Sequence, residues 1–480
     1  MSEDMHGGER TGSDRCCRGP KCQWTVMVYF ASDDVDQYDV ENLEKLKKAG
    51  STDEVALLAQ VDPTGNKQST RYWLNRETKL EEDVVRRFPN LSAGSPDALI
   101  DFVKWGTDAA PAAHNMVLIW GHGDGWQNED NAGRAAGRTI NVNVHKQRIK
   151  SALGLGGVKC DQIETLLDRL AFLPNRDAGG LRAPDVLDGP ALKKVFATLR
   201  ECLDRKIDLL GMDSCLMAMI EVAYQVRDEV EYMVASEDVT PVGSWPYDSI
   251  FKELIRRPTV SPSELGQIIV RQYLIEYLDQ TRFVTQSVCR PALSENLAEV
   301  VNKLAEELKE GLKNDRTCKA IMSARAMVQD FYIKDYVDLY NFCDILAEIL
   351  GESHGLTPLC KSVMRITGRV SGSTESPDTF VTVHGFYGYP LRGSHGASIY
   401  FPCSGFSTQY DQLDFAKTKW RGFIESYAAM LNGSVVASGA SPGGTAPGGH
   451  LGGMLGDGQL GPGDPVSIPP DPLNARKPCK

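Results

Sequence analysis

Residues 207–226 read IDLLGMDSCLMAMIEVAYQV, and this stretch decides the fold. The run from 207 to 212 is apolar on both faces, which is typical of a strand buried in a parallel sheet. The apolar spacing from 215 to 226 predicts a helix directly after a sharp turn. Because strand, turn and helix follow one another, the stretch indicates an α/β protein with a mainly parallel sheet.

The same alternation recurs on both sides of this segment. Further strands are predicted at residues 24–30, 55–61, 116–120 and 232–236, and helices within residues 36–50, 96–105 and 190–203. Buried strands separated by helices imply a sheet that helices cover on both faces.

After residue 260 helical patterns dominate the sequence. Helices are predicted at 263–278, 291–312, 320–329, 335–350 and 415–431, and a late strand that can return to the sheet edge at 397–402. We therefore expect a flexible leader (1–23), an α/β core (24–260), a helical accessory region (261–432) and a tail (433–480). The tail holds 12 glycines and 8 prolines in 48 residues, so we expect it to be disordered. Residues 127–188, rich in turn formers, are expected to be a mobile insertion in the core.

The composition narrows the classes of protein to which the chain can belong. Of 480 residues, 42% are hydrophobic and 24% charged, which is typical of a globular protein. The formal net charge of -12 disfavours nucleic acid as a partner. No apolar run is long enough to predict a membrane span, and no secretory signal is recognisable, so we expect a cytoplasmic protein. Export by another route stays open.

The 12 cysteines are mostly solitary and lie in apolar patterns, as in proteins of a reduced compartment. Cys16, Cys17 and Cys22, with His6 upstream, form the exception. Zinc is conceivable there, but the second ligand pair is missing, so a thiol-bearing leader is the favoured interpretation and no metal-ligating set is assigned.

Two residues at strand ends carry the chemistry. His122 follows a predicted strand in MVLIWGHGDGW, residues 116–126, and Cys215 follows the strand at 207–212. The carboxyl ends of neighbouring parallel strands meet at one sheet edge, and a thiol at a helix N-terminus beside an imidazole favours thiolate. The pair fits a nucleophile and its base. The alternatives are a histidine that only bonds backbone in a turn and a buried structural cysteine.

Four segments then resemble a known family: VMVYFASDD, VLIWGHGDGW, DLLGMDSCLMAMIEVAYQ and VASEDVTPVGSWPYDSI. They are similar to the clostripain family of cysteine peptidases, of the caspase, legumain and gingipain clan. The resemblance covers residues 24–255 and, through SIYFP and its following helix, reaches about residue 430. It implies a caspase-like fold, and it leaves out the leader and the tail.

The resemblance assigns His122 as general base and acid and Cys215 as the nucleophile that forms a thioacyl-enzyme. Acyl transfer also needs donors for the oxyanion, and the backbone N–H groups of Gly123 and Cys215 are the natural pair. Asp124 could orient a neighbour, although an exposed turn aspartate is the simpler interpretation.

The resemblance also associates an acid two residues before the nucleophile with selection of Arg or Lys. Asp213 holds that position, and a partly desolvated carboxylate pairs well with guanidinium. The alternative is a turn aspartate that caps the following helix, with Ser214 as the competing cap. Asp238 and Asp248 could supply a second acid to the same pocket.

Members of the family often mature by cleavage between the His and Cys segments. Here Arg134 and Arg138 lie in that interval, so we expect self-processing after a basic residue; the alternative is an ordinary solvated loop. The chemistry requires no cofactor. Some relatives depend on calcium, for which acidic turns such as residues 128–130 offer oxygen ligands, but no EF-hand spacing is present.

These residues are compatible with three functions. The first is an endopeptidase that cleaves protein or peptide substrates after Arg or Lys. The second is a caspase-like peptidase of other specificity, against which Asp213 argues. The third is a non-catalytic interaction protein on the same fold, which should have lost His122 or Cys215, yet both are present.

Overall fold

A computed structural model gives the three-dimensional structure of the chain. It describes residues 22–31, 36–62, 68–89, 95–126, 187–241, 243–278, 282–368, 378–403 and 405–439. Residues 1–434 form one compact unit and residues 435–480 a second, of which only the end of a helix is described. The predicted leader, most of the insertion and most of the tail therefore lie outside the described residues.

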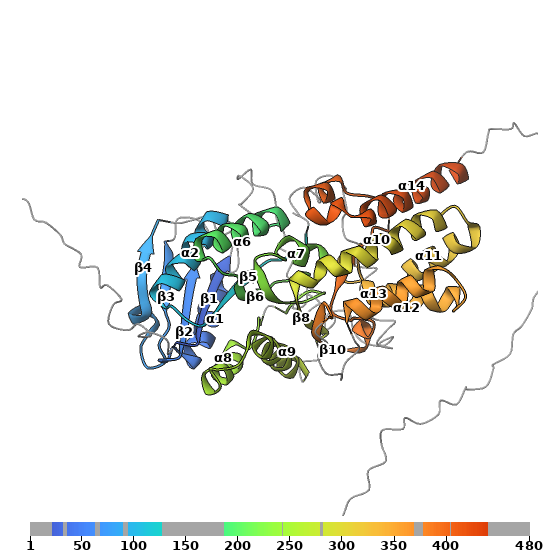
Figure 1. The fold of residues 1–480 in the computed structure, drawn as a ribbon. Coiled ribbons are helices and arrows are strands. Elements are labelled where there is room, and N and C mark those ends of the chain that lie inside the picture. The colour runs from blue at the N-terminus through green and yellow to red at the C-terminus, as the bar shows by residue number, and fades with distance from the viewer. Residues whose placement is uncertain are drawn as a thin grey trace, which may run out of the picture. The chain divides into compact units, whose positions relative to one another are not determined.

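A sheet forms the centre of the first unit (Figure 1). Its described strands are, from edge to edge, β10 (Val381–Tyr387), β8 (Val284–Cys289), β7 (Val230–Ala235), β6 (Ile207–Asp213), β5 (His114–Gly121), β1 (Trp24–Ala31), β2 (Val55–Val61), β3 (Ser69–Trp73) and β4 (Val84–Phe88). The middle strands from β7 to β2 are parallel, which confirms the mainly parallel sheet. The two strands at each edge are antiparallel.

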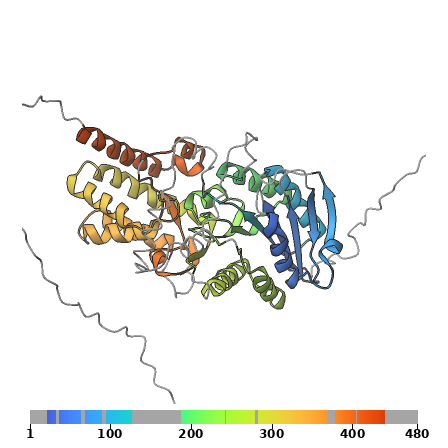
Figure 2. The same cartoon turned by 180° about the vertical axis from the view of Figure 1, so that it is seen from behind.

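Helices cover both faces of this sheet, as Figures 1 and 2 show. One face carries α2 (Pro96–Ala109), α6 (Gly189–Leu203) and α7 (Ile220–Gln225), and the other carries α1 (Asp36–Ala49), α8 (Tyr247–Arg256) and α9 (Pro262–Leu278). Side chains of β1 alternate between the two cores: Met27 and Tyr29 pack on the first face, Val26 and Val28 on the second. Burial on both faces explains why these strands read as continuous apolar runs.

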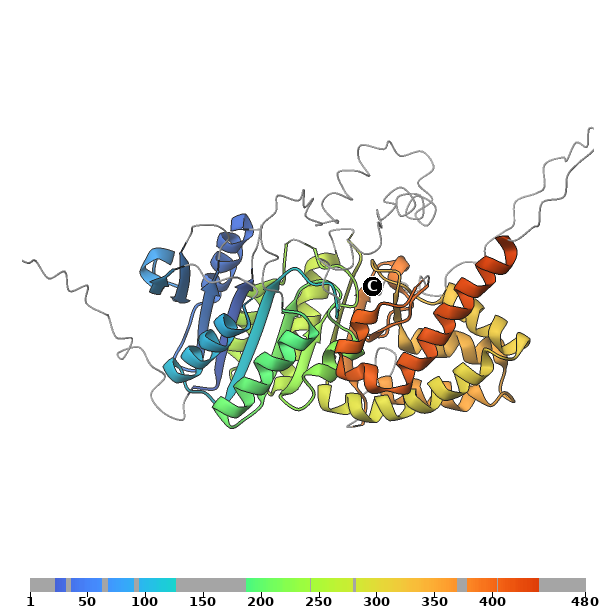
Figure 3. The same ribbon diagram turned by 90° about the horizontal axis from the view of Figure 1, so that it is seen from above.

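The later helices gather beyond the β8 and β10 edge, as Figure 3 shows. They are α10 (Ser294–Gly311), α11 (Asp315–Met327), α12 (Leu339–Leu350), α13 (Leu356–Thr367) and α14 (Lys419–Gly439). Short 3-10 turns add η3 (Pro291–Leu293), η4 (Tyr389–Leu391), η5 (Thr408–Gln412) and η6 (Asp414–Lys417), whereas η2 (Leu80–Asp83) precedes β4 at the other edge of the sheet. The apolar side chains of helices α10 to α14 share one core with those of α2 and α6, so these helices complete the first face of the sheet.

The structure differs from the sequence prediction in three strands of this region. Strands β8 and β10, which were not predicted, extend the sheet within the accessory region expected at 261–432. The strand predicted at 397–402 does not return to the sheet: β11 (Ser398–Tyr400) pairs antiparallel with β9 (Tyr336–Asp338) in a separate two-stranded sheet. Because β9 occupies these residues and the Asp338 carboxylate caps α12, that helix begins at residue 339, not 335.

The helix predicted at 215–226 is also wrong in its first turn. Leu216 has a left-handed φ of 64°, and α7 begins only at Ile220. The amides of Leu216 and Ala218 donate to the carbonyls of Asp238 and Ser236, at 3.2 and 2.9 Å, instead of to a helical partner. The residues after β6 are therefore held by the segment after β7.

Candidate active site

The register of the sheet brings the two predicted site residues to one edge. Trp120 of β5 pairs with Asp213 of β6, and His122 and Cys215 each lie two residues further along. A Cβ atom on Gly123 would lie only 2.3 Å from the carbonyl oxygen of Cys215 and 3.0 Å from its nitrogen. The two turns are thus in backbone contact, which only glycine at position 123 permits.

The turn that carries His122 is fixed by the residues on its C-terminal side. His122 itself is exposed, whereas Trp126 is buried, with its ring edge-to-face with Tyr400 and Tyr410 at 5.0 and 5.1 Å. Gly125 has a φ of 68° and packs against Tyr336, whose hydroxyl donates to the Asp124 carbonyl at 2.7 Å. A solvent-facing imidazole therefore stands on a rigid support.

Cys215 is half-buried in the turn after β6. Its Sγ lies 3.3 Å from the amide nitrogen of Thr240 and 3.5 Å from that residue's hydroxyl. The pKa of the Cys215 thiol is raised to about 11, mainly by burial and also by the charges of Asp124 and Asp238, while the Thr240 contacts oppose the shift. The prediction that a helix N-terminus favours thiolate here is wrong, because α7 starts five residues later. The resting thiol is neutral and needs a base.

Two backbone donors face the same edge. Neither the Gly123 nor the Cys215 amide donates to an acceptor among the residues that the structure describes. Both amides belong to the two turns that meet. These are the donors expected from the sequence for an oxyanion.

Asp213, the last residue of β6, is buried, with 3% of its surface exposed. Its Oδ2 accepts from the hydroxyls of Ser244 and Tyr247, the latter at 2.6 Å, and from the amide of Trp245 at 2.9 Å. Burial raises the pKa of Asp213, although these three bonds oppose the shift. The capping alternative is wrong for both Asp213 and Ser214, since the N-cap of α7 is Met219.

The two additional acids lie in different settings. Asp238 follows β7, and its Oδ1 accepts from the amides of Val239 and Tyr332, both at 2.9 Å. Asp248 is in the first turn of α8 and pairs with Lys252 at 3.3 Å. Asp238 shares the edge with Cys215, whereas Asp248 forms a helix-surface ion pair.

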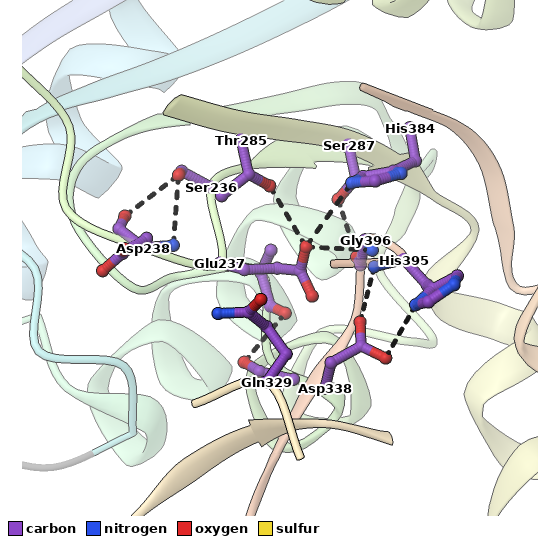
Figure 4. A network of polar contacts seen from close by, with 12 residues as sticks. Ser236, Glu237, Asp238, Thr285, Ser287, Gln329, Asp338, His384, His395 and Gly396 are labelled. Atoms are coloured by element: carbon purple, nitrogen blue, oxygen red, sulfur yellow. Dashed lines mark hydrogen bonds and ion pairs between the residues drawn. The ribbon is translucent and has the colours of Figure 1, made fainter. Parts of the chain in front are cut away.

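Sequence reasoning missed Thr240 and Glu237. Both come after β7, at the carboxyl edge where ligands bind in parallel sheets, and this position was the available signal. Figure 4 shows Glu237 beside Ser236 and Asp238, with its carboxyl turned toward β8. The segment 236–240 thus holds the Cys215 turn on one side and a buried polar network on the other.

Several predicted residues lie outside the described part of the chain. These are Arg134, Arg138, the acidic turn at 128–130, and His6, Cys16 and Cys17. Cys22 is described and buried, with its Sγ 3.6 Å from the Trp24 carbonyl oxygen. Within the described ranges, no group of three His, Cys, Asp or Glu side chains could hold a metal ion, and no helix is long and apolar enough to cross a membrane.

Comparison with known proteins agrees with this geometry. The sequence profile of the clostripain family matches residues 28–148 and 183–427. A secreted C11 cysteine protease from Bacteroides thetaiotaomicron, solved with an irreversible peptide inhibitor, is 17% identical over 84% of this chain and 99% of its own, with a TM-score of 0.54. An inactive zymogen C11 protease from Parabacteroides distasonis is 18% identical over 83% and 98%, with a TM-score of 0.50. No protein with a curated description matches significantly.

These likenesses confirm the caspase-like fold, and they contradict one prediction. We expected a cytoplasmic protein because no secretory signal was recognisable. The Bacteroides thetaiotaomicron protease, whose fold spans 84% of this chain, is a secreted enzyme. The cytoplasmic location is therefore withdrawn.

Proposed function

Because the chain belongs to the clostripain family of cysteine proteases, we propose that it is an endopeptidase with Cys215 as nucleophile and His122 as proton carrier. The observation that carries this proposal is the backbone contact between Gly123 and Cys215, which joins the two turns. A nucleophile, a base and two oxyanion donors then occupy one edge of the sheet.

The proposed reaction has two halves. His122 takes the proton of the Cys215 thiol, which its raised pKa keeps neutral at rest, and the sulfur attacks the carbonyl carbon of the scissile bond. The amides of Gly123 and Cys215 stabilise the oxyanion, and the imidazolium protonates the leaving amine. Water, deprotonated by His122, then hydrolyses the thioester and regenerates the thiol.

We further propose that substrates carry Arg or Lys before the cleaved bond. The support is Asp213: its three donors converge on Oδ2, and no described residue donates to Oδ1. A guanidinium at Oδ1 would favour the ionised carboxylate, which burial otherwise disfavours. Asp238 and Asp248 remain proposed second acids.

The test is a fluorogenic peptide panel that varies only the residue before the cleaved bond, with Cys215→Ala as the blank. We expect cleavage after Arg and Lys and none after Asp or Leu. Cleavage of other residues at similar kcat/KM would favour a caspase-like peptidase of different specificity, and no cleavage by wild type beyond the blank would contradict catalysis. Parallel assays with calcium or a chelator test calcium dependence, for which we assign no ligands.

Self-processing is the last part of the proposal. Residues 127–188 join the His122 turn to α6, and Arg134 and Arg138 are the proposed cleavage sites. Purified wild type should give two associated fragments, while Cys215→Ala stays intact. N-terminal sequencing locates the cut, and an intact, fully active wild type would show that residues 127–188 are an ordinary insertion.

A further inference from the structure

Glu237 is a fully buried acid two residues after the end of β7 (Figure 4). Its Oε2 accepts from the amide of Gly396 at 3.0 Å and from the hydroxyl of Thr285 at 3.1 Å. His384 of β10 faces the same oxygen, with its Nε2 at 3.6 Å. The other oxygen, Oε1, is buried and receives no N–H or O–H donor among the described residues.

The neighbour of Glu237 is a second buried carboxyl, Asp338, whose charge acts on it directly. Asp338 caps α12: it accepts from the Asn341 amide at 2.6 Å, from the His395 amide at 2.6 Å, and lies 3.1 Å from Nδ1 of that imidazole. Asp338 thus already accepts two amide donors, whereas Oε1 of Glu237 accepts none among the described residues.

Two carboxyl groups can share a hydrogen bond only when one of them carries a proton. Since the Asp338 oxygens already accept from two backbone amides, we place the shared proton on Glu237. Burial, and next the charge of Asp338, raise the pKa of Glu237 well above its usual range. His384 offers no compensating cation, because burial lowers its pKa to about 4.

The neutral Glu237 lies in the segment that holds the nucleophile. Its neighbours Ser236 and Asp238 accept from the amides of Ala218 and Leu216, which fixes the turn around Cys215. Three residues further on, the amide and hydroxyl of Thr240 contact the Cys215 sulfur. Any shift of the segment 236–240 therefore moves groups that touch the thiol.

We propose that Glu237, as a neutral acid hydrogen-bonded to Asp338, is a positioning residue for Cys215. It fixes the segment 236–240 against β8 and the Gly396 turn, and through Thr240 it sets the environment of the sulfur. This role rests on the proposed function of Cys215. The titratable groups that face Glu237 are Asp338 before α12, His384 on β10 and, beyond Asp338, His395.

Two substitutions separate the neutral acid from an ionised one. In Glu237→Gln the amide nitrogen can donate to Asp338 while the carbonyl oxygen accepts from Gly396 and Thr285, so the network is kept. Glu237→Ala leaves Asp338 without its donor and the Gly396 amide without its acceptor. If Glu237 were instead an anion paired with a protonated His384, the Gln variant would fail as badly as the Ala variant.

The matched control is Asp208→Ala. Asp208 is another buried carboxyl, at the opposite end of β6 from Cys215, where it accepts from the Asn115 amide at 2.8 Å and from Arg205 at 2.8 Å. Its loss should destabilise the fold without touching the segment 236–240. Comparison with this variant distinguishes positioning from a loss of stability.

The experiment measures kcat and KM on the best peptide of the panel, and the rate of iodoacetamide alkylation at Cys215 by mass spectrometry of the labelled peptide, across pH 7 to 11. In Glu237→Ala we expect kcat to fall about tenfold or more with KM little changed, because misplaced groups at the sulfur act on the chemical step. Alkylation at pH 9 should slow about threefold or more, because the Thr240 contacts lower the thiol pKa.

Glu237→Gln should stay within about twofold of wild type in both rates at neutral pH. It should also keep its activity at alkaline pH better than wild type, since Gln cannot ionise beside Asp338. Asp208→Ala should match wild type in kcat at a temperature where it is folded. Three outcomes would each overturn the proposal. The first is an equal fall in kcat in Glu237→Gln and Glu237→Ala, and the second is an equal fall in kcat in Glu237→Ala and Asp208→Ala. The third is faster alkylation of Cys215 in Glu237→Ala than in wild type.

If Glu237→Ala does not fold, Thr285→Val is the second variant, because it removes one donor to Glu237 and keeps the side-chain shape. We expect a smaller fall in kcat in the same direction, and an unchanged rate would contradict the proposal. The alkylation assay needs no peptidase activity. Failure of wild type to cleave any peptide would therefore refute the proposed function and still leave the positioning of Cys215 measurable.

Discussion

Asp213 and Glu237 are two buried acids at the ends of neighbouring strands, and they are held in opposite ways. Asp213 receives three donors from the short segment 244–247, all on one oxygen. Glu237 receives one amide and one hydroxyl, and in our proposal it donates its proton to the carboxyl of Asp338. Burial raises the pKa of both acids. The three donors around Asp213 can stabilise its ionised form once a cation binds beside it, whereas the neighbouring carboxyl of Asp338 favours the protonated form of Glu237.

This contrast has a functional meaning only if Cys215 is the reactive group. Cys215→Ala should reduce peptidase activity by about a thousandfold or more, because only binding and oxyanion donors are left, and His122→Ala should be nearly as damaging. Circular dichroism should show an unchanged fold in both. Activity near wild type in either variant would reject the proposed pair and remove the ground for comparing the two acids.

Asp213→Asn tests the donor-rich acid. We expect kcat/KM for cleavage after Arg to fall about thirtyfold, or about 2 kcal/mol, because the guanidinium loses its counter-charge in a buried site. The control is Asp315→Asn, whose exposed carboxylate pairs with Lys319 on the surface of α11 and should matter little. An unchanged preference for Arg in Asp213→Asn would place the pocket at Asp238 or elsewhere.

The difference between the two acids also explains what the sequence could predict. Cys215 and His122 lie just after the ends of strands that are buried on both faces, so an apolar run followed by a turn locates them, whereas the role of Asp213 was implied only by the family resemblance. The parallel order of those strands then brings them to one edge. The middle of the sheet, its two helical layers and the predicted pair at its edge were therefore accessible from the sequence.

Glu237 was not accessible, because its partners come from distant segments. The Gly396 amide is 159 residues away and Thr285 is 48 residues away. Strand β8, VTQSVC, buries Thr285 and Ser287 where a strand pattern would have apolar residues, so it reads as a loop. The start of α7 was missed for the same reason, since the amides of Leu216 and Ala218 bond to residues after β7 and not within a helix.

The rates at which individual cysteines are alkylated give a smaller effect, which tests how the surroundings of Cys215 control its thiol. Asp124 and Asp238 add to burial in raising the pKa of Cys215 to about 11, so at pH 8 only about one thiol in a thousand is ionised. The buried Cys289, which has no opposing donors, should react more slowly still. Cys202 is exposed, so it should be alkylated before Cys215.

The measurement is mass spectrometry of each cysteine peptide after timed exposure to iodoacetamide at several pH values. The Cys215 rate should rise about tenfold per pH unit up to about pH 10, as expected for a thiolate. A pH-independent rate faster than that of Cys202 would mean that His122 already holds the thiol proton at rest.

The smallest effect is on stability, and it tests whether Glu237 is protonated in the folded protein. Its folded pKa lies above the ordinary value of 4.5, so between these two values the folded state binds more protons than the unfolded state. The stability that Glu237 contributes is therefore complete below pH 4.5 and is lost as pH rises through the raised pKa. Gln does not titrate, so the Tm of Glu237→Gln relative to wild type should increase across this window, by about 1–3 °C, and then stay constant.

The control is Glu310→Gln, which replaces an exposed glutamate paired with Lys313 and so measures the effect of a surface carboxyl. A Tm difference that does not change with pH would mean that Glu237 is ionised throughout and that its neutral bond to Asp338 does not exist.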